Sequence, residues 1–289
     1  MKNLEYELRI LSIEDADDLL QLTNEIEWFF PMNYWKILLA TGQVFGLYSS
    51  TNELVATTAI YDFGEQLAFL GVVIVRAKYR GQGLATRVID AAEKSLPKTT
   101  TPVALIATDD GKPVYERRGY KVFGDCTKFL RAPDASLMDF PGLTGFQLIS
   151  IQEQHLEAIK RFDVDSFGAD RSHVLSVLLG ENLPSVVLID ENTDRIMGYA
   201  LTSIRHDTLI VGPVVAEDVS HAVVMVQQLV SDRDEEIRID VLSHQTAFKE
   251  ALEKLAFTKI EVSPVMVLGN GDDYIGKPKT FAMTSQALG

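Results

Sequence analysis

The segment from residue 67 to residue 92 constrains the fold of this chain more than any other. Residues 67–75 form an apolar run that predicts a buried strand, and residues 86–92 have helical spacing. Between them lies the glycine-rich turn Arg80-Gly81-Gln82-Gly83-Leu84-Ala85. A strand, such a turn and a helix start expose unpaired backbone N–H groups at the positive end of the helix dipole. The segment therefore predicts an anion site that suits phosphate.

Two other phosphate motifs do not match this turn. No Gly-Lys-Ser/Thr follows at the spacing of a P-loop, and the dinucleotide fingerprint needs a third glycine where this chain has Thr86. A glycine-containing turn without a ligand is the alternative interpretation. Arg80 before the turn and the small Ala85 at the helix entry favour the phosphate site, because glycines let a ligand approach the backbone.

The same residues resemble a known family. Residues 72–85, VVIVRAKYRGQGLA, resemble motif A of the GCN5-related N-acetyltransferases (GNAT), whose acetyl-CoA loop reads Arg/Gln-x-x-Gly-x-Gly/Ala. Residues 107–120, ATDDGKPVYERRGY, resemble motif B of that family, in which a helix ends at Tyr-Glu-x-x-Gly-Phe. The two motifs follow in the family's order, and the resemblance covers residues 1–131.

The resemblance implies acetyl-CoA as co-substrate. Val73 and Val75 of the predicted strand are then expected to offer backbone groups to the pantetheine arm. Arg80 adds charge or fixes the loop. The pyrophosphate is expected to meet the N–H groups of Gly81, Gln82, Gly83, Leu84, Ala85 and Thr86.

The implied reaction is direct attack of an amine on a thioester, which requires a proton for the leaving thiolate. Tyr115, inside the match to motif B, is the predicted general acid, since a phenol has a reference pKa of about 10. A core tyrosine with a bonded hydroxyl is the alternative. The general base stays open: the strand before motif A carries no carboxylate. Glu27 and Glu65 are the candidates, with Asp62 beside Glu65. The alternative interpretation of each is a solvated carboxylate on the surface.

Acceptor recognition has two sequence candidates. Trp28 and Tyr34 belong to an aromatic cluster that can hold a cation over a ring face, or that packs in a core. Asp170 and Arg171 follow a small-residue turn and are predicted to reach the first half's cleft and bind an amine. Equally, Asp170 caps a helix over residues 171–179.

The order of predicted elements occurs twice along the chain. Residues 132–144, with Pro133, Pro141 and Gly142, read as a linker. We expect an α/β layered protein with two tandem GNAT-like domains, each a mixed central sheet flanked by helices. The predicted domains are residues 1–131, which are catalytic, and residues 145–289. The predicted strands cover 6–9, 44–48, 53–61, 67–75 and 103–106 in the first half, and 146–149, 185–190, 196–204, 208–215 and 237–241 in the second.

The second half differs from the first at the positions that carry chemistry. Glu217 and Asp218 stand near the turn where phosphates would lie, and Leu252 stands where the first half has Tyr115. The second half resembles the degenerate C-terminal domain of some bacterial family members. It is predicted to lack the acetyl-CoA site.

Composition limits the partners. A net charge of −14 argues against nucleic acid, and no apolar run approaches membrane-spanning length. The single cysteine, Cys126, excludes an internal disulfide and reads as a core thiol, which fits a reducing cytosol. The five histidines lack metal-site spacing, so no metal is expected. We expect a cytoplasmic monomer or homodimer.

Two function classes remain. The first is an acetyl-CoA-dependent N-acetyltransferase acting on a primary amine of a small molecule. The alternative is a non-catalytic acyl-CoA-binding or interaction module, or a transferase that uses another acyl-CoA. The intact loop and Tyr115 favour the enzyme.

Overall fold

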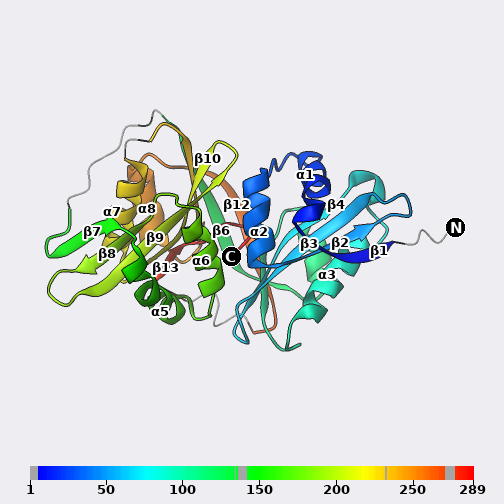
Figure 1. Cartoon of the computed structure of the whole chain (residues 1–289), viewed down its shortest axis with the longest axis horizontal. Coiled ribbons are helices and arrows are strands. Elements are labelled where there is room, and N and C mark those ends of the chain that lie inside the picture. The colour runs from blue at the N-terminus through cyan, green and yellow to red at the C-terminus, as the bar shows by residue number, and fades with distance from the viewer. Residues whose placement is uncertain (1–5, 134, 136–141, 232, 271–276) are drawn as a thin grey trace.

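The computed structural model describes residues 6–133, 135, 142–231, 233–270 and 277–289. Its strands form one mixed 13-stranded sheet in the order β1-β2-β3-β4-β5-β12-β6-β11-β10-β9-β8-β7, with β13 paired to β10. Figure 1 shows the first half, in blue and cyan, beside the second half, in green to orange, with β6 and β12 between them. The predicted α/β architecture, a sheet flanked by helices in each half, is confirmed.

In the first half, Ser12 caps the first helical turn. The Ser12 hydroxyl accepts from the Glu14 N–H, and the Asp15 carboxylate accepts from the Ser12 N–H at 2.9 Å. Its elements are β1 (Glu7–Leu11), η1 (Ile13–Asp15), α1 (Ala16–Asn24), α2 (Met32–Thr41), β2 (Gln43–Tyr48), β3 (Leu54–Asp62), β4 (Ala68–Val75), η2 (Ala77–Tyr79), α3 (Leu84–Ser95), β5 (Val103–Ile106), α4 (Lys112–Arg117) and β6 (Lys121–Arg131).

The second half follows a similar order and adds one strand, β13, near the end of the chain. Its elements are β7 (Phe146–Ser150), η3 (Glu153–His155), α5 (Leu156–Phe167), α6 (Ser172–Gly180), β8 (Val186–Asp190), β9 (Arg195–Arg205), β10 (Thr208–Ala216), α7 (Val219–Val230), β11 (Glu236–Leu242), α8 (Thr246–Lys254), β12 (Thr258–Leu268) and β13 (Thr280–Ala282). None of the helices in the described ranges is long and apolar enough to cross a bilayer.

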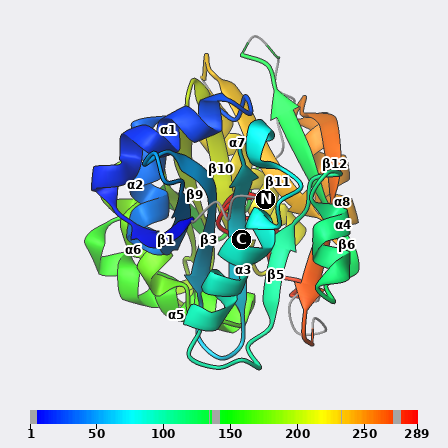
Figure 2. The same cartoon turned by 90° about the vertical axis from the view of Figure 1, so that its right-hand side faces the viewer.

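Helices cover both faces of the sheet. One apolar core includes Leu19 and Trp35 from α1 and α2 together with Ile159 and Leu175 from α5 and α6, so it continues from one half into the other. Helix α3 packs in two further cores, one of which it shares with α4, and α7 and α8 pack in another core in the second half. Figure 2 shows α1 and α2 on one side of the first half's strands and α4 on the other.

The two halves exchange strands in the middle of the sheet. β12, from the second half, pairs with β5 (Val265 opposite Ile106) and with β6. β6, from the first half, continues the sheet by pairing with β11 (Phe129 opposite Ile239). The predicted linker, residues 132–144, directly follows β6; its residues 134 and 136–141 lie outside the described ranges. Each half therefore completes its sheet with a strand of the other.

Two openings in the sheet result from parallel strands that part. β4 and β5 pair only at Ala68–Val103 and Phe69–Ala104 and then diverge. β10 and β11 pair from Thr208–Glu236 to Ile210–Arg238 and also diverge. In each half, the chain leaves the opening and enters a helix: β4 leads to α3, and β10 leads to α7. These openings position the candidate site.

Candidate functional site

The predicted anion loop joins β4 to α3 and is exposed. Gly81 and Gly83 have left-handed φ angles of 76° and 75°, and a Cβ added to either would meet nothing within 4 Å. Gly83 is the N-cap of α3 and supplies no side-chain hydrogen bond. The Arg87 N–H bonds the Gly83 carbonyl oxygen at 3.2 Å, so the preceding N–H groups lie at an uncapped helix start. These residues fit a phosphate group.

Side chains around the loop hold it in place. The Arg80 Nε donates to the Val75 carbonyl oxygen at 3.3 Å, and its guanidinium lies 3.8 Å from the Asp110 carboxylate. The Tyr6 hydroxyl donates to Gln82 Oε1 at 2.7 Å, a contact that the sequence did not predict. Val73 and Val75, the predicted pantetheine contacts, are half-buried on β4 at the opening beside β5.

Tyr115 lies on α4, just after β5, and is 6% exposed. Its ring centroid is 5.7 Å from that of Tyr120. The Tyr120 hydroxyl donates to Glu93 at 2.8 Å, whereas no acceptor for the Tyr115 hydroxyl occurs within the described ranges. Burial raises the pKa of Tyr115. The phenol is therefore protonated at neutral pH and has a proton to donate.

The structure places Glu27 and Glu65, the two candidate bases, in different parts of the first half. Glu65 pairs with Lys98 at 2.5 Å, and Asp62 accepts from the Gly64 N–H at 2.9 Å, both before β4 begins. The predicted role of Glu65 is wrong, because it lies at the opposite end of β4 from the loop and from Tyr115. Glu27 is exposed between α1 and α2, directly before Trp28.

The predicted role of Arg171 in substrate binding is also wrong. Its guanidinium is 1% exposed and makes two hydrogen bonds, of 3.0 and 2.9 Å, to the Asp163 carboxylate. The segment that suggested a projecting turn is helical to Phe167 and ends at Gly168, whose φ is 86°. Asp170 accepts from the Ser172 N–H at 2.9 Å, and hydrogen bonds from the side chain and backbone of Ser172 lower the pKa of Asp170. The N-cap residue of α6 is Arg171, not Asp170 as the alternative interpretation expected.

The opening in the second half is filled by the chain itself. β13 pairs with β10, with Thr280 opposite Val215, and the Met283 N–H bonds the Asp240 carbonyl oxygen of β11 at 2.9 Å. Asp218 accepts from the His221 N–H at 3.0 Å and so caps α7 with a carboxylate. Both features occupy positions that correspond to the predicted anion site of the first half.

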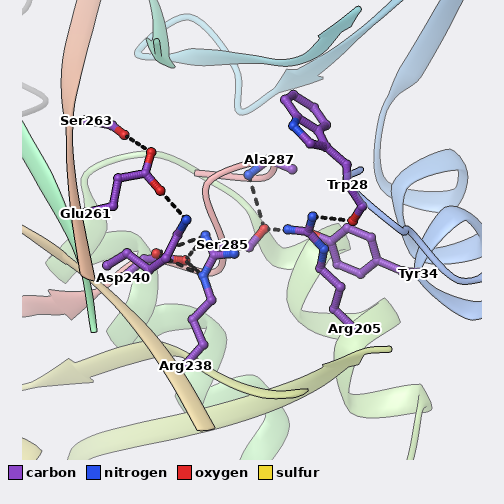
Figure 3. A network of polar contacts seen from close by, with 10 residues as sticks. Trp28, Tyr34, Arg205, Arg238, Asp240, Glu261, Ser263, Ser285 and Ala287 are labelled. Carbon is purple, nitrogen blue, oxygen red and sulfur yellow. Dashed lines mark hydrogen bonds and ion pairs between the residues drawn. The ribbon is translucent and has the colours of Figure 1, made fainter. Parts of the chain in front are cut away.

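A groove of about 320 Å³ lies between the halves; we call it the interhalf groove. Trp28, one of the predicted acceptor residues, lines it, and Tyr34 lies buried nearby with its hydroxyl 2.9 Å from Ser285 Oγ. Figure 3 shows Trp28 and Tyr34 beside Arg205. No local sequence signal indicates the groove's other lining residues, because they come together only in the tertiary fold. They are Phe29, Lys128, Leu130, Arg205, His206, Thr208, Ile210, Glu236 and Arg238.

Comparisons with known proteins agree with this architecture. Models of the acetyltransferase (GNAT) domain match residues 36–129 and residues 159–275. The uncharacterized N-acetyltransferase YitH of Bacillus subtilis (strain 168) is 26% identical over 284 residues, which is 98% of each chain.

Solved structures share the fold of the whole chain. A candidate acetyltransferase from Pyrococcus horikoshii superposes with a TM-score of 0.78 at 16% identity, covering 100% of this chain and 99% of the other. A tandem GNAT protein from the clavulanic acid biosynthesis pathway has a TM-score of 0.66 at 13% identity, covering 91% and 98%.

Proposed function

Since this chain is an N-acetyltransferase of the GNAT family with two such domains in tandem, we propose that its first half transfers an acetyl group from acetyl-CoA to a primary amine of a small molecule. The observation that carries the proposal is the exposed, uncapped helix start at Gly83, which precedes α3 beside the opening of β4 and β5. In the described part of the second half, β13 lies in the equivalent opening and occupies that position.

The donor is held by backbone groups in this proposal. The pyrophosphate meets the N–H groups of residues 81–86, where the left-handed glycines leave open space. The pantetheine arm lies along Val73 and Val75 in the opening between β4 and β5. Arg80 is tied to the Val75 carbonyl oxygen and so fixes the turn as well as adding positive charge.

Acetyl transfer then requires one proton at the leaving sulfur. The amine nitrogen bonds to the acetyl carbon, the C–S bond breaks, the sulfur gains a proton and the nitrogen loses one. Tyr115 supplies the proton at sulfur, because its buried phenol stays protonated and its hydroxyl is unpaired within the described ranges. Glu27, through a water molecule, accepts the proton from the amine.

The test follows free-thiol release from acetyl-CoA across a panel of small amines, beside a direct measurement of CoA binding. The proposal expects turnover with at least one amine. CoA binding with no turnover on any amine would instead favour a non-catalytic acyl-CoA-binding module. Absence of CoA binding would contradict both.

A further inference from the structure

The interhalf groove is basic in an acidic protein. Its titratable lining consists of Lys128, Arg205, His206, Arg238 and the single carboxylate Glu236, although the chain has a net charge of −14. A lining cation that lacks a carboxylate partner is available to a ligand of negative charge.

Most of these groups already have partners inside the protein. The Arg238 guanidinium makes hydrogen bonds of 3.0 to 3.1 Å to the Asp240 carboxylate, and Lys128 is paired with Glu261. Glu236 accepts from the Thr208 hydroxyl at 2.9 Å. Figure 3 shows the Arg238–Asp240 pair and Glu261 away from Arg205, with Ser285 between. Their charges are largely satisfied.

Arg205 is different. Its Nη2 donates to the Trp28 carbonyl oxygen at 2.6 Å, and its guanidinium carbon lies 4.2 Å from the centre of the Phe30 ring. Within the described ranges it has no carboxylate within the 4.0 Å of an ion pair. Burial lowers the pKa of Arg205, because removal from water disfavours the charged guanidinium. A guanidinium carries five N–H donors in a fork that matches a carboxylate or a phosphate.

One strand, β12, connects the groove's surroundings with the proposed transfer site. Its Glu261 pairs with Lys128, which lines the groove. Pro264, three residues further along β12, accepts from the Ala107 N–H at 3.0 Å through its carbonyl oxygen, just after β5. At about 3.3 Å per residue, Glu261 and Pro264 lie about 10 Å apart along the strand.

We infer, on the basis of the proposed acetyl transfer, that the interhalf groove binds the anionic end of the acceptor through Arg205. The acceptor is then a small primary amine that also carries a carboxylate or a phosphate group. Trp28 and the 51% exposed Phe29 cover its apolar middle part. The first half holds the acetyl donor, and β9 of the second half selects the acceptor by charge.

Matched acceptors test this inference. The pairs are 6-aminohexanoate with 6-aminohexanamide, and 6-aminohexyl phosphate with 6-aminohexanol, together with shorter homologues. The charged member should have a kcat/KM about tenfold or more above its neutral partner, as expected for a charge-assisted hydrogen bond. Arg205→Gln should remove this preference and leave CoA affinity unchanged. Arg195→Gln, at the exposed far end of the same strand, is the control and should keep the preference.

A binding readout separates this inference from acetyl transfer itself. Trp28 fluorescence should change when the charged product 6-acetamidohexanoate or the matching phosphate is added. The neutral amide should cause no change in fluorescence. With the Arg205→Gln or the Trp28→Phe protein, none of the probes should cause a change. Equal turnover of charged and neutral amines overturns the inference but leaves the proposed function standing. If no amine is acetylated, the proposed function fails; absence of any Trp28 response to the charged probes then overturns the inference as well.

Discussion

Tyr115 and Tyr120 lie with their ring centroids 5.7 Å apart, yet the hydroxyl of Tyr120 is bonded to Glu93 while that of Tyr115 has no partner within the described ranges. These two buried phenols in one cluster thus differ in the pairing of their hydroxyl groups. That difference makes Tyr120 a matched control for the proposed general acid.

Replacing Tyr115 by phenylalanine should therefore lower kcat by about 10²- to 10⁴-fold, the usual range for a lost general acid. CoA affinity, measured by calorimetry, should stay within about twofold, since we place no donor-binding contact on the hydroxyl. Tyr120→Phe should lower stability rather than kcat, because it leaves the Glu93 carboxylate without this donor. Unchanged turnover in Tyr115→Phe would remove Tyr115 as the acid.

The pH profile should show no deprotonation of Tyr115 in the usual assay range. Burial raises its pKa above the ordinary value of about 10, so the folded enzyme keeps the proton that an unfolded chain loses. Below about pH 10 the phenol is protonated in both the folded and the unfolded state, so stability is at its full value. As pH rises further, only the unfolded chain loses the proton, and the free energy of unfolding falls. Between pH 7 and 10, kcat should not fall through deprotonation of Tyr115. A fall in this range that is present in the native enzyme and absent in Tyr115→Phe would contradict the assignment.

The Asp163–Arg171 pair should act on stability rather than on catalysis. Both side chains are 1% exposed, and removing one partner leaves a buried charge unpaired. Arg171→Met should lower the free energy of unfolding by about 3 to 5 kcal/mol. In the double variant Asp163→Leu/Arg171→Met, part of that loss should be recovered. Denaturant unfolding gives these values, and a selective loss of acceptor affinity in folded Arg171→Met would support the rejected substrate role.

Strand exchange should make the two halves unfold together. Val265 on β12 is fully buried between β5 and β6, so Val265→Ala should cost about 2 kcal/mol and shift the whole transition. Differential scanning calorimetry of the full chain should show one transition. Two separate transitions, with only one moved by Val265→Ala, would show that the halves are independent.

Local sequence patterns were enough to predict the elements that carry the proposed donor site. The strand predicted at 67–75 is β4, and the helix after Gly83 starts at Leu84. An apolar run and a glycine-rich turn encode these features within a few residues. Tyr115 could be singled out in the same way, because its neighbours in sequence form the motif around it.

The acceptor side could not be predicted in this way. Residues 259–263 alternate polar and apolar side chains, but Ile260 and Val262 are exposed, and no local signal indicates that β12 pairs with β5 of the other half. Arg205 ends a strand like many surface arginines. Its contacts with Trp28 and Phe30 exist only in the folded protein. There, within the described ranges, its guanidinium has no carboxylate partner.

The most direct test of the account is calorimetric titration of acetyl-CoA into the whole protein. We predict one site per chain, and Gly83→Ala should weaken it by about tenfold or more, because a Cβ at φ 75° intrudes where the phosphates approach. Gly64→Ala, at φ 87° in a turn remote from the loop, is the control for backbone strain and should leave affinity unchanged. Two sites per chain, or one site of undiminished affinity in Gly83→Ala, would contradict a single donor site at the Arg80–Thr86 loop.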